Sequence, residues 1–157
     1  MMFDEKINYC ILHNNPDENF INKLGSIPIV KDLEFNKLVE RLEFFPNKQV
    51  IFNETLFGLK LDEKMEIFKL LKKQNISYIN VTSNVEDALY SDYIFVYDGN
   101  KLVLEGNRNE VLKEEKTLKR LGYGLPFVVD LSIQLNYYDI FNKVYYDLDE
   151  LVRALWN

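Results

Sequence analysis

Residues 49–59 have the sequence Gln-Val-Ile-Phe-Asn-Glu-Thr-Leu-Phe-Gly-Leu, a short apolar run followed by polar residues and a glycine. A short apolar run bounded by turn residues is typical of a strand buried on both faces, so we expect a strand over Gln49–Phe52. The charged segment that follows predicts a helix over Asp62–Lys73, with Asp62 as its N-cap. Three of its apolar positions are expected to face inward: Met65, Phe68 and either Leu70 or Leu71.

Two further apolar runs flank this unit, and they predict strands over Ile7–Leu12 and Ile76–Val81. Amphipathic segments between the strands predict helices over Asp17–Leu24, which Gly25 closes, and over Leu33–Phe45, which ends before Pro46. Strands that alternate with helices indicate a mainly parallel sheet, in which the three apolar strands are neighbours in the core.

The second half of the chain begins with Asn84, a predicted cap of a helix over Val85–Leu89. Residues 93–97 and 101–104 predict an edge hairpin around Asp-Gly-Asn at 98–100. A helix is expected over Asn109–Leu121, ending at Gly122, and the pattern then becomes helical or irregular, with a last helix over Leu148–Trp156. We therefore expect an α/β core over residues 1–121 and a small helical extension over residues 122–157.

Composition excludes several classes of function. The 157 residues carry a net charge of −6, and no stripe of Lys and Arg would attract nucleic-acid phosphates. Cys10 is the only cysteine and His13 the only histidine, which argues against a disulfide framework, a zinc site or a catalytic dyad, so His13 is interpreted as an ordinary loop residue. No signal peptide and no membrane span of ~20 apolar residues is visible. The expectation is a cytoplasmic protein without a metal or cofactor.

Four motifs in order resemble the ATP-binding subunits of ABC transporters. Residues 49–59 resemble the Walker B strand and D-loop, and Val-Thr-Ser-Asn-Val-Glu-Asp-Ala at 81–88 resembles the switch loop. Residues 91–106 resemble the closing hairpin, and Asn-Glu-Val-Leu at 109–112 matches the helix after it. One such motif would be weak, but four in the right order make a specific resemblance.

The C-terminal part resembles a narrower group, the ATPases of energy-coupling factor transporters. Leu-Gly-Tyr-Gly-Leu-Pro and the apolar run that follows it, residues 121–135, look like the start of their C-terminal extension, and residues 149–156 look like its end. Residues 1–48 resemble the family more faintly, with 7–20 in place of the Walker A strand, loop and helix and 29–33 where the signature helix would begin. The resemblance implies a three-layer P-loop-NTPase-like core in a truncated and degenerate form, with the helical subdomain deleted.

The resemblance also identifies a vestigial phosphate loop: Asn14, Asn15, Pro16, Asp17, Glu18 and Asn19. A functional loop needs glycines whose N–H groups surround the phosphates, a Lys for their charge and a Ser or Thr for Mg²⁺. This loop has no glycine, its proline has no N–H group, and Glu18 stands about where the Lys belongs. We expect no nucleotide binding here, because the two carboxylates would repel a triphosphate.

The remaining catalytic positions are also altered. Asn53 replaces the Walker B aspartate that holds Mg²⁺, and Ser83 replaces the switch histidine. Glu54 is retained where the family polarises the attacking water, although without a nucleotide it is interpreted as a strand-end residue that bonds the nearby loop. The chain is thus expected not to be an enzyme. The alternative is an ATP-binding protein that binds or weakly hydrolyses nucleotide in a new site built on Glu54 and Asn53.

The favoured function is that of a pseudo-ATPase acting through association, as a homodimer or as a heterodimer with an ABC-type ATPase at the periphery of a transporter. Phe127, Val128, Leu131 and Leu135 recur at helical spacing and predict one apolar stripe that needs a cover. The candidate interface residues are Phe127, Leu131, Leu135, Leu155 and Trp156. Two alternatives stay open: Trp156 packs on its own domain, or the chain is a decayed remnant without function. The near-complete core pattern argues against a remnant.

Overall fold

A computed structural model describes residues 2–31 and 34–157. The predicted start of a helix at Leu33, and the end of the segment compared with the signature helix, lie outside the described residues. The six strands form one sheet in the order β2-β3-β4-β1-β5-β6, in which all neighbours are parallel except the last pair. The strands are β1 (Tyr9–Leu12), β2 (Ile29–Val30), β3 (Gln49–Asn53), β4 (Ser77–Thr82), β5 (Tyr93–Asp98) and β6 (Lys101–Asn107).

The α/β fold with a mainly parallel sheet is confirmed. The three apolar strands of the sequence analysis are neighbours as β3, β4 and β1, and the predicted hairpin β5–β6 lies at one edge. The helices are α1 (Glu18–Asn22), α2 (Phe35–Glu43), α3 (Leu61–Lys73), the 3₁₀ helix η1 (Val85–Tyr90), α4 (Arg108–Val111), α5 (Glu115–Arg120), α6 (Phe127–Tyr137) and α7 (Leu148–Trp156).

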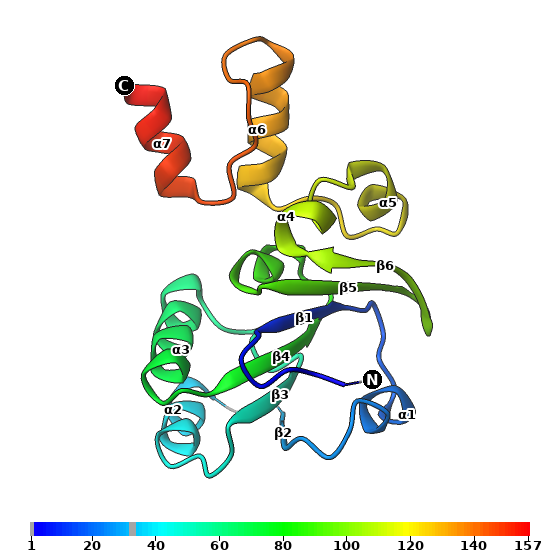
Figure 1. Ribbon diagram of the computed structural model, residues 1–157. Coiled ribbons are helices and arrows are strands. Elements are labelled where there is room, and N and C mark those ends of the chain that lie inside the picture. The colour runs from blue at the N-terminus through cyan, green and yellow to red at the C-terminus, as the bar shows by residue number, and fades with distance from the viewer. Residues whose placement is uncertain (1, 32–33) are drawn as a thin grey trace.

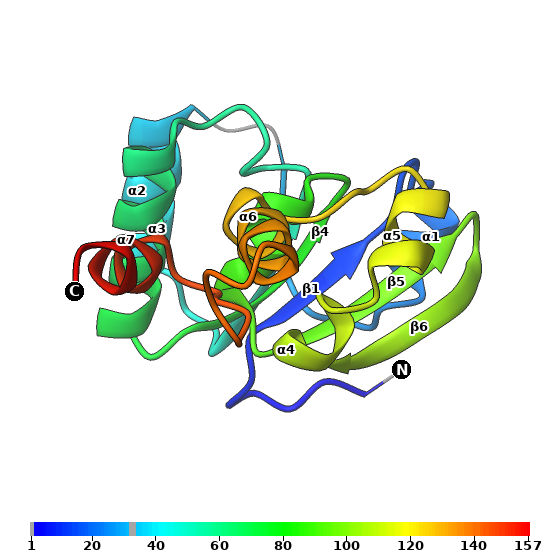
Figure 2. The ribbon, with the colours of Figure 1, turned by 90° about the horizontal axis from the view of Figure 1, so that it is seen from above.

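Helices cover both faces of the sheet, which makes three layers (Figures 1 and 2). On one face α1 buries Phe20 and Ile21 against the central strands. On the other face α2 and α3 cover β3 and β4, while η1, α4 and α5 cover β1 and β5. Because β1, β3 and β4 are wholly or almost wholly buried, apolar side chains point to both faces and period-2 alternation is absent.

The helix α3 differs from its prediction in its start and its inner face. Its N-cap is Lys60, whose N–H group donates to Glu63 Oε1 at 2.9 Å, and Asp62 lies in the first turn. This contact between the N-cap and the third helical residue sets the start. The buried positions are Lys64, Ile67 and Leu71, whereas Met65 and Phe68 are only half-buried.

Two other segments differ from what the sequence indicated. Residues 29 and 30, compared with the place where the signature helix would begin, form the edge strand β2, because Ile51 donates to Pro28 O at 2.8 Å and extends the ladder. The single helix over residues 109–121 is divided into α4 and α5. The break lets Val111, Leu112 and Leu118 all enter the same core. Gly122 does end the second piece, with a φ of +88° that suits glycine.

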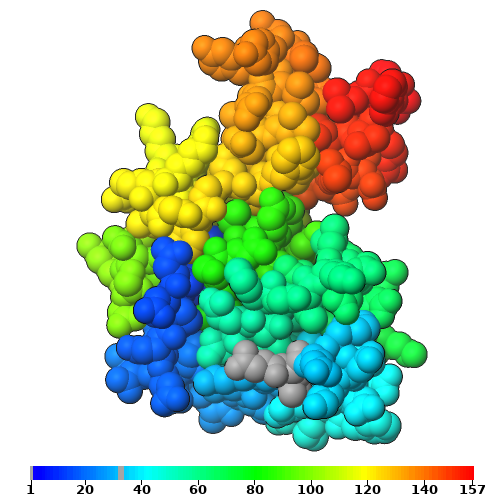
Figure 3. All heavy atoms as spheres, turned by 180° about the vertical axis from the view of Figure 1, so that it is seen from behind, coloured from blue at the N-terminus to red at the C-terminus, as the bar shows by residue number. Residues whose placement is uncertain are grey.

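The C-terminal extension continues the core instead of standing apart from it. Val128 and Val129 of α6 and Leu151 of α7 belong to the same buried cluster as Cys10 and Leu12 of β1. The outer ends of α6 and α7 project from the molecule (Figure 3). The division into 1–121 and 122–157 stays a prediction.

The interpretation of residues 127, 128, 131 and 135 as one stripe is wrong. Val128 is buried, whereas the neighbouring Phe127 is 61% exposed. Leu131 and Leu135 are half-buried and pack against the chain's own core and the segment around Phe141. The physical reason is that the return segment 138–147 folds back along α6 and covers these positions. None of the described helices is long and apolar enough to cross a membrane.

Candidate functional site

The carboxyl ends of β1, β3 and β4 meet at one edge of the sheet, where parallel α/β folds place their sites. The N–H group of His13 donates to Thr82 O at 3.0 Å, and that of Glu54 donates to Val81 O at 2.9 Å. These bonds bring together the ends of three strands, and with them Asn53, Glu54 and Ser83, which are all half-buried. The structure thus assembles the positions that sequence comparison aligned with the family's catalytic residues.

The loop after β1 is held by bonds within the chain. The Asn15 N–H group donates to His13 Nδ1 at 3.1 Å, and Asn14 Nδ2 donates to Leu121 O at 3.2 Å. Pro16 is half-buried and has no N–H group to offer. The remaining residues of the predicted phosphate loop, Asp17, Glu18 and Asn19, are exposed.

The helix after this loop differs from the helix that follows a phosphate-binding loop. Helix α1 has only five residues, and Asp17 caps it by accepting the Phe20 N–H group on Oδ1 at 2.7 Å. A carboxylate therefore occupies the helix N-terminus, where a phosphate would lie in a nucleotide-binding loop. The residues present do not fit a Mg-nucleotide, because the Asn15 and Phe20 N–H groups are engaged, Pro16 has none, and the Asp17 carboxylate faces the place of the phosphates.

His13 is the residue that sequence reasoning misjudged at this edge. It is buried, its ring lies 4.5 Å from that of Phe20 and 5.7 Å from that of Tyr97, and its Nε2 lies 3.2 Å from Asn100 Oδ1. The interpretation as an ordinary loop residue is wrong, because the imidazole ties the loop to the β5–β6 hairpin. Its position directly after an apolar strand was the only signal in the sequence.

Glu54 is a residue at this edge that could act as a base. Its backbone is left-handed, with a φ of +59°, an uncommon conformation for a side chain of this kind. Burial raises the pKa of the Glu54 carboxyl, and a positive charge on nearby His13 would lower it. In residues 2–31 and 34–157 no group of three His, Cys, Asp or Glu side chains could hold a metal ion. The arrangement thus places the Glu54 carboxylate at the same edge as the carboxylate of Asp17.

A second polar cluster lies under the sheet and was missed. Lys64 Nζ and Asp87 Oδ1 are 2.8 Å apart, with the two side chains 9% and 1% exposed. Asn80 of β4 is also buried, and neither atom of its amide has a hydrogen bond to any residue that the structure describes. Asn80, between the apolar Ile79 and Val81 of β4, was the available signal.

The extension presents apolar side chains to solvent, chiefly on α7. We call the exposed apolar residues of this helix the α7 face: Leu148 (50% exposed), Val152 (41%), Leu155 (46%) and Trp156 (83%). Trp156 therefore does not pack on its own domain. Asp147 caps the helix by accepting the Glu150 N–H group on Oδ1 at 3.1 Å. Of the predicted interface residues, Phe127, Leu155 and Trp156 are free of the core, while Leu131 and Leu135 are partly covered.

Comparison with known proteins identifies the relatives of the chain. It is 31% identical over 112 residues to the energy-coupling factor transporter ATP-binding protein EcfA1 of Lactobacillus delbrueckii subsp. bulgaricus, a match that covers 68% of this chain and 40% of that protein. It is 33% identical over 89 residues to EcfA1 of Clostridioides difficile, with 54% and 32% covered. The chain thus spans about two-fifths or less of the length of these curated relatives. No family model matches it.

A solved structure supports the same fold. The structure of cbiO1 from Clostridium perfringens, described as part of the ABC transporter complex cbiONQ, superposes with a TM-score of 0.51 at 18% sequence identity. The superposition covers 77% of this chain and 85% of that chain. At this level of identity the likeness concerns the fold alone. Together with the curated relatives, it confirms the resemblance that the motifs indicated.

Proposed function

We propose that this ABC-ATPase-like chain, a partial relative of the ATP-binding subunits of energy-coupling factor transporters, acts by protein–protein association and does not hydrolyse ATP. The observation that carries the proposal is the loop after β1. Side chains of the loop itself accept the Asn15 and Phe20 N–H groups, and Asp17 places a negative charge at the N-terminus of α1.

The exposed α7 face supports association. Four apolar side chains on one short helix are accessible although the opposite side of that helix buries Leu151 completely. An apolar helix face that is free in the monomer gains free energy when a partner covers it. We assign this face to a second copy of the chain or to an ABC-type ATPase, at the cytoplasmic side of a transporter.

Size-exclusion chromatography with light scattering tests the proposal, with the chain alone and with a related ATP-binding subunit. A dimer, or a stable complex with that subunit, is expected. A chain that stays monomeric at high concentration and ignores the subunit refutes association. Calorimetry with ATP and Mg²⁺ tests the other half, and tight binding there would refute the loss of nucleotide recognition.

The second candidate function uses Glu54 as a general base in a nucleotide site. Its half-buried carboxyl, with a pKa raised by burial, and its place at the edge where β1, β3 and β4 end are the observations that favour it. Slow release of phosphate from ATP that is lost in Glu54→Gln, while the fold is kept, would support this candidate over the first.

A further inference from the structure

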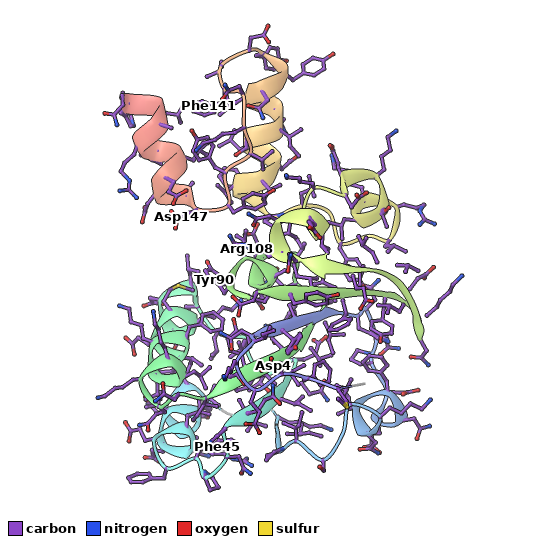
Figure 4. The ribbon with its side chains drawn as sticks, viewed as in Figure 1. Asp4, Phe45, Tyr90, Arg108, Phe141 and Asp147 are labelled. Carbon is purple, nitrogen blue, oxygen red and sulfur yellow. The ribbon has the colours of Figure 1, made fainter. Side chains whose placement is uncertain are left out.

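A pocket of about 390 Å³ lies where α3, η1, α6 and α7 begin. Its walls are mostly apolar and include Leu61, Phe127 and Leu148, together with the rings of Tyr90 and Tyr146. Asp147, at the start of α7, faces the end of η1 at Tyr90 across the junction between the core and the extension (Figure 4). Its volume is within the range of ~300–1,000 Å³ that small-molecule sites occupy.

Three carboxylates line this pocket: Glu86, Asp87 and Asp147. One oxygen of each carboxylate accepts a hydrogen bond from another residue of the chain. Glu86 Oε1 accepts the Phe127 N–H group at 2.6 Å, Asp87 Oδ1 accepts from Lys64 Nζ at 2.8 Å, and Asp147 Oδ1 accepts the Glu150 N–H group. Asp87 Oδ2 is buried and has no hydrogen-bond partner among residues 2–31 and 34–157. The pocket therefore contains acceptors that the chain itself leaves unused.

The charges in the pocket do not balance. Lys64 is the cation that lines it, against three carboxylates. The ring of Tyr90 lines the same pocket, and burial together with the charges of Glu86, Asp87 and Asp147 raises the pKa of its hydroxyl. Arg108 is near, but it lies in the adjoining cleft, where it donates to Leu89 O and its guanidinium carbon is 5.4 Å from the Tyr146 ring centroid. A positively charged ligand would restore the balance.

We propose that this pocket binds a small organic cation, an ammonium group carried on an apolar body. The aromatic rings attract a cation through their electron-rich faces, and the carboxylates provide the countercharge. The apolar walls exclude water from the body of the ligand and strengthen both interactions. The pocket shares Leu148 with the α7 face, whereas the carboxylates that would hold the cation lie outside that face.

Phenyltrimethylammonium is a suitable probe, because it combines a quaternary ammonium with one ring. Isothermal titration calorimetry is expected to show binding that is weakened by salt, while benzenesulfonate, with the opposite charge, does not bind. Glu86→Gln and Asp147→Asn should each lower the affinity by about fivefold or more. Both changes keep an oxygen that can accept the internal hydrogen bond, so the fold is retained.

Glu105→Gln is the matched control, because it removes the same charge from an exposed position on β6, outside the pocket lining. Its affinity for the probe should equal that of the wild type. Three results would overturn the proposal: no binding of the probe, equal binding of benzenesulfonate, or an equal loss in Glu105→Gln. The last would show that net charge, and not the pocket, attracts the cation.

Discussion

Replacement of Lys64 by Met tests whether the buried ion pair has the energetic role that its geometry indicates. Lys64 Nζ and Asp87 Oδ1 are 2.8 Å apart, and both side chains are shielded from water. Met retains most of the aliphatic stem, so the main change is the loss of the charge. Removal of one partner of a buried pair leaves the other charge uncompensated, and typically costs about 3–5 kcal/mol. For a chain of this size the midpoint of thermal unfolding should fall by roughly 6–20 °C.

The pH dependence of this deficit gives a second test. Burial raises the pKa of Asp87, while Lys64, which donates a hydrogen bond to Asp87 Oδ1, opposes the rise. The loss of Lys64 should raise the pKa further. A carboxyl whose pKa is higher in the folded state stabilises the fold below its unfolded pKa, and this stability is lost as the pH rises through the folded value. The deficit should therefore be largest at neutral pH and should shrink in acid.

Urea unfolding at pH 7 and pH 5 measures both effects, with Lys69→Met as the control. Lys69 is exposed on the same helix, so its replacement should change stability by less than about 0.5 kcal/mol. Lys64→Met with Asp87→Leu should recover most of the loss, because no unpaired charge remains. A deficit below about 1 kcal/mol, or one that does not depend on pH, would refute the assigned role of the pair.

Three further predictions concern the loop and the surface. Calorimetry should detect no binding of ATP with Mg²⁺ by the wild type or by Asn53→Asp, because the phosphate loop still lacks its glycine amides and its Lys; a micromolar affinity in either would contradict this. Trp156→Ala should shift the protein toward monomer in light scattering, by about 2 kcal/mol or more if the ring is a central anchor. Tyr137→Ala, which also removes an exposed ring, is the control, and equal effects would disprove the α7 face as the interface. His13→Ala should lower the free energy of unfolding by about 2–4 kcal/mol in urea, because a buried ring and its hydrogen bonds are lost; a change below about 1 kcal/mol would show that the loop does not depend on it.

The parts of the fold that could be predicted depend on neighbours in the sequence. The strand over residues 49–52 follows from one apolar run, and the caps Asn84 and Asp147 bond N–H groups two and three residues away. The two-residue strand β2 could not be found in this way, because its pairing with β3 depends on residues more than 20 positions away. That β3, β4 and β1 are neighbours in the core could be predicted, because short strands alternating with helices allow few arrangements, whereas their order came from the structure.

The sequence predicted which residues lie at the candidate site, but only part of the contacts that hold the site together. The positions of Asn53, Glu54 and Ser83 follow from motifs whose spacing is set by single strands and turns. The closure of the loop by His13 does not, because its ring contacts Tyr97 and Asn100, which lie more than 80 residues further along the chain. The sequence showed only a His directly after a strand, a pattern that occurs in many loops and does not indicate a buried ring.

By itself the sequence determined the alternation of strands and helices, the hairpin and the last helix. Only the tertiary structure decided that Lys64 is inside and Trp156 outside. The periodicity of a helix shows that its residues differ in polarity from face to face, but which face is covered depends on the elements that pack against it. Lys64 is buried because it forms an ion pair with Asp87 of the neighbouring helix η1. Trp156 is exposed because α7 packs against the core through Leu151, on another side of the helix.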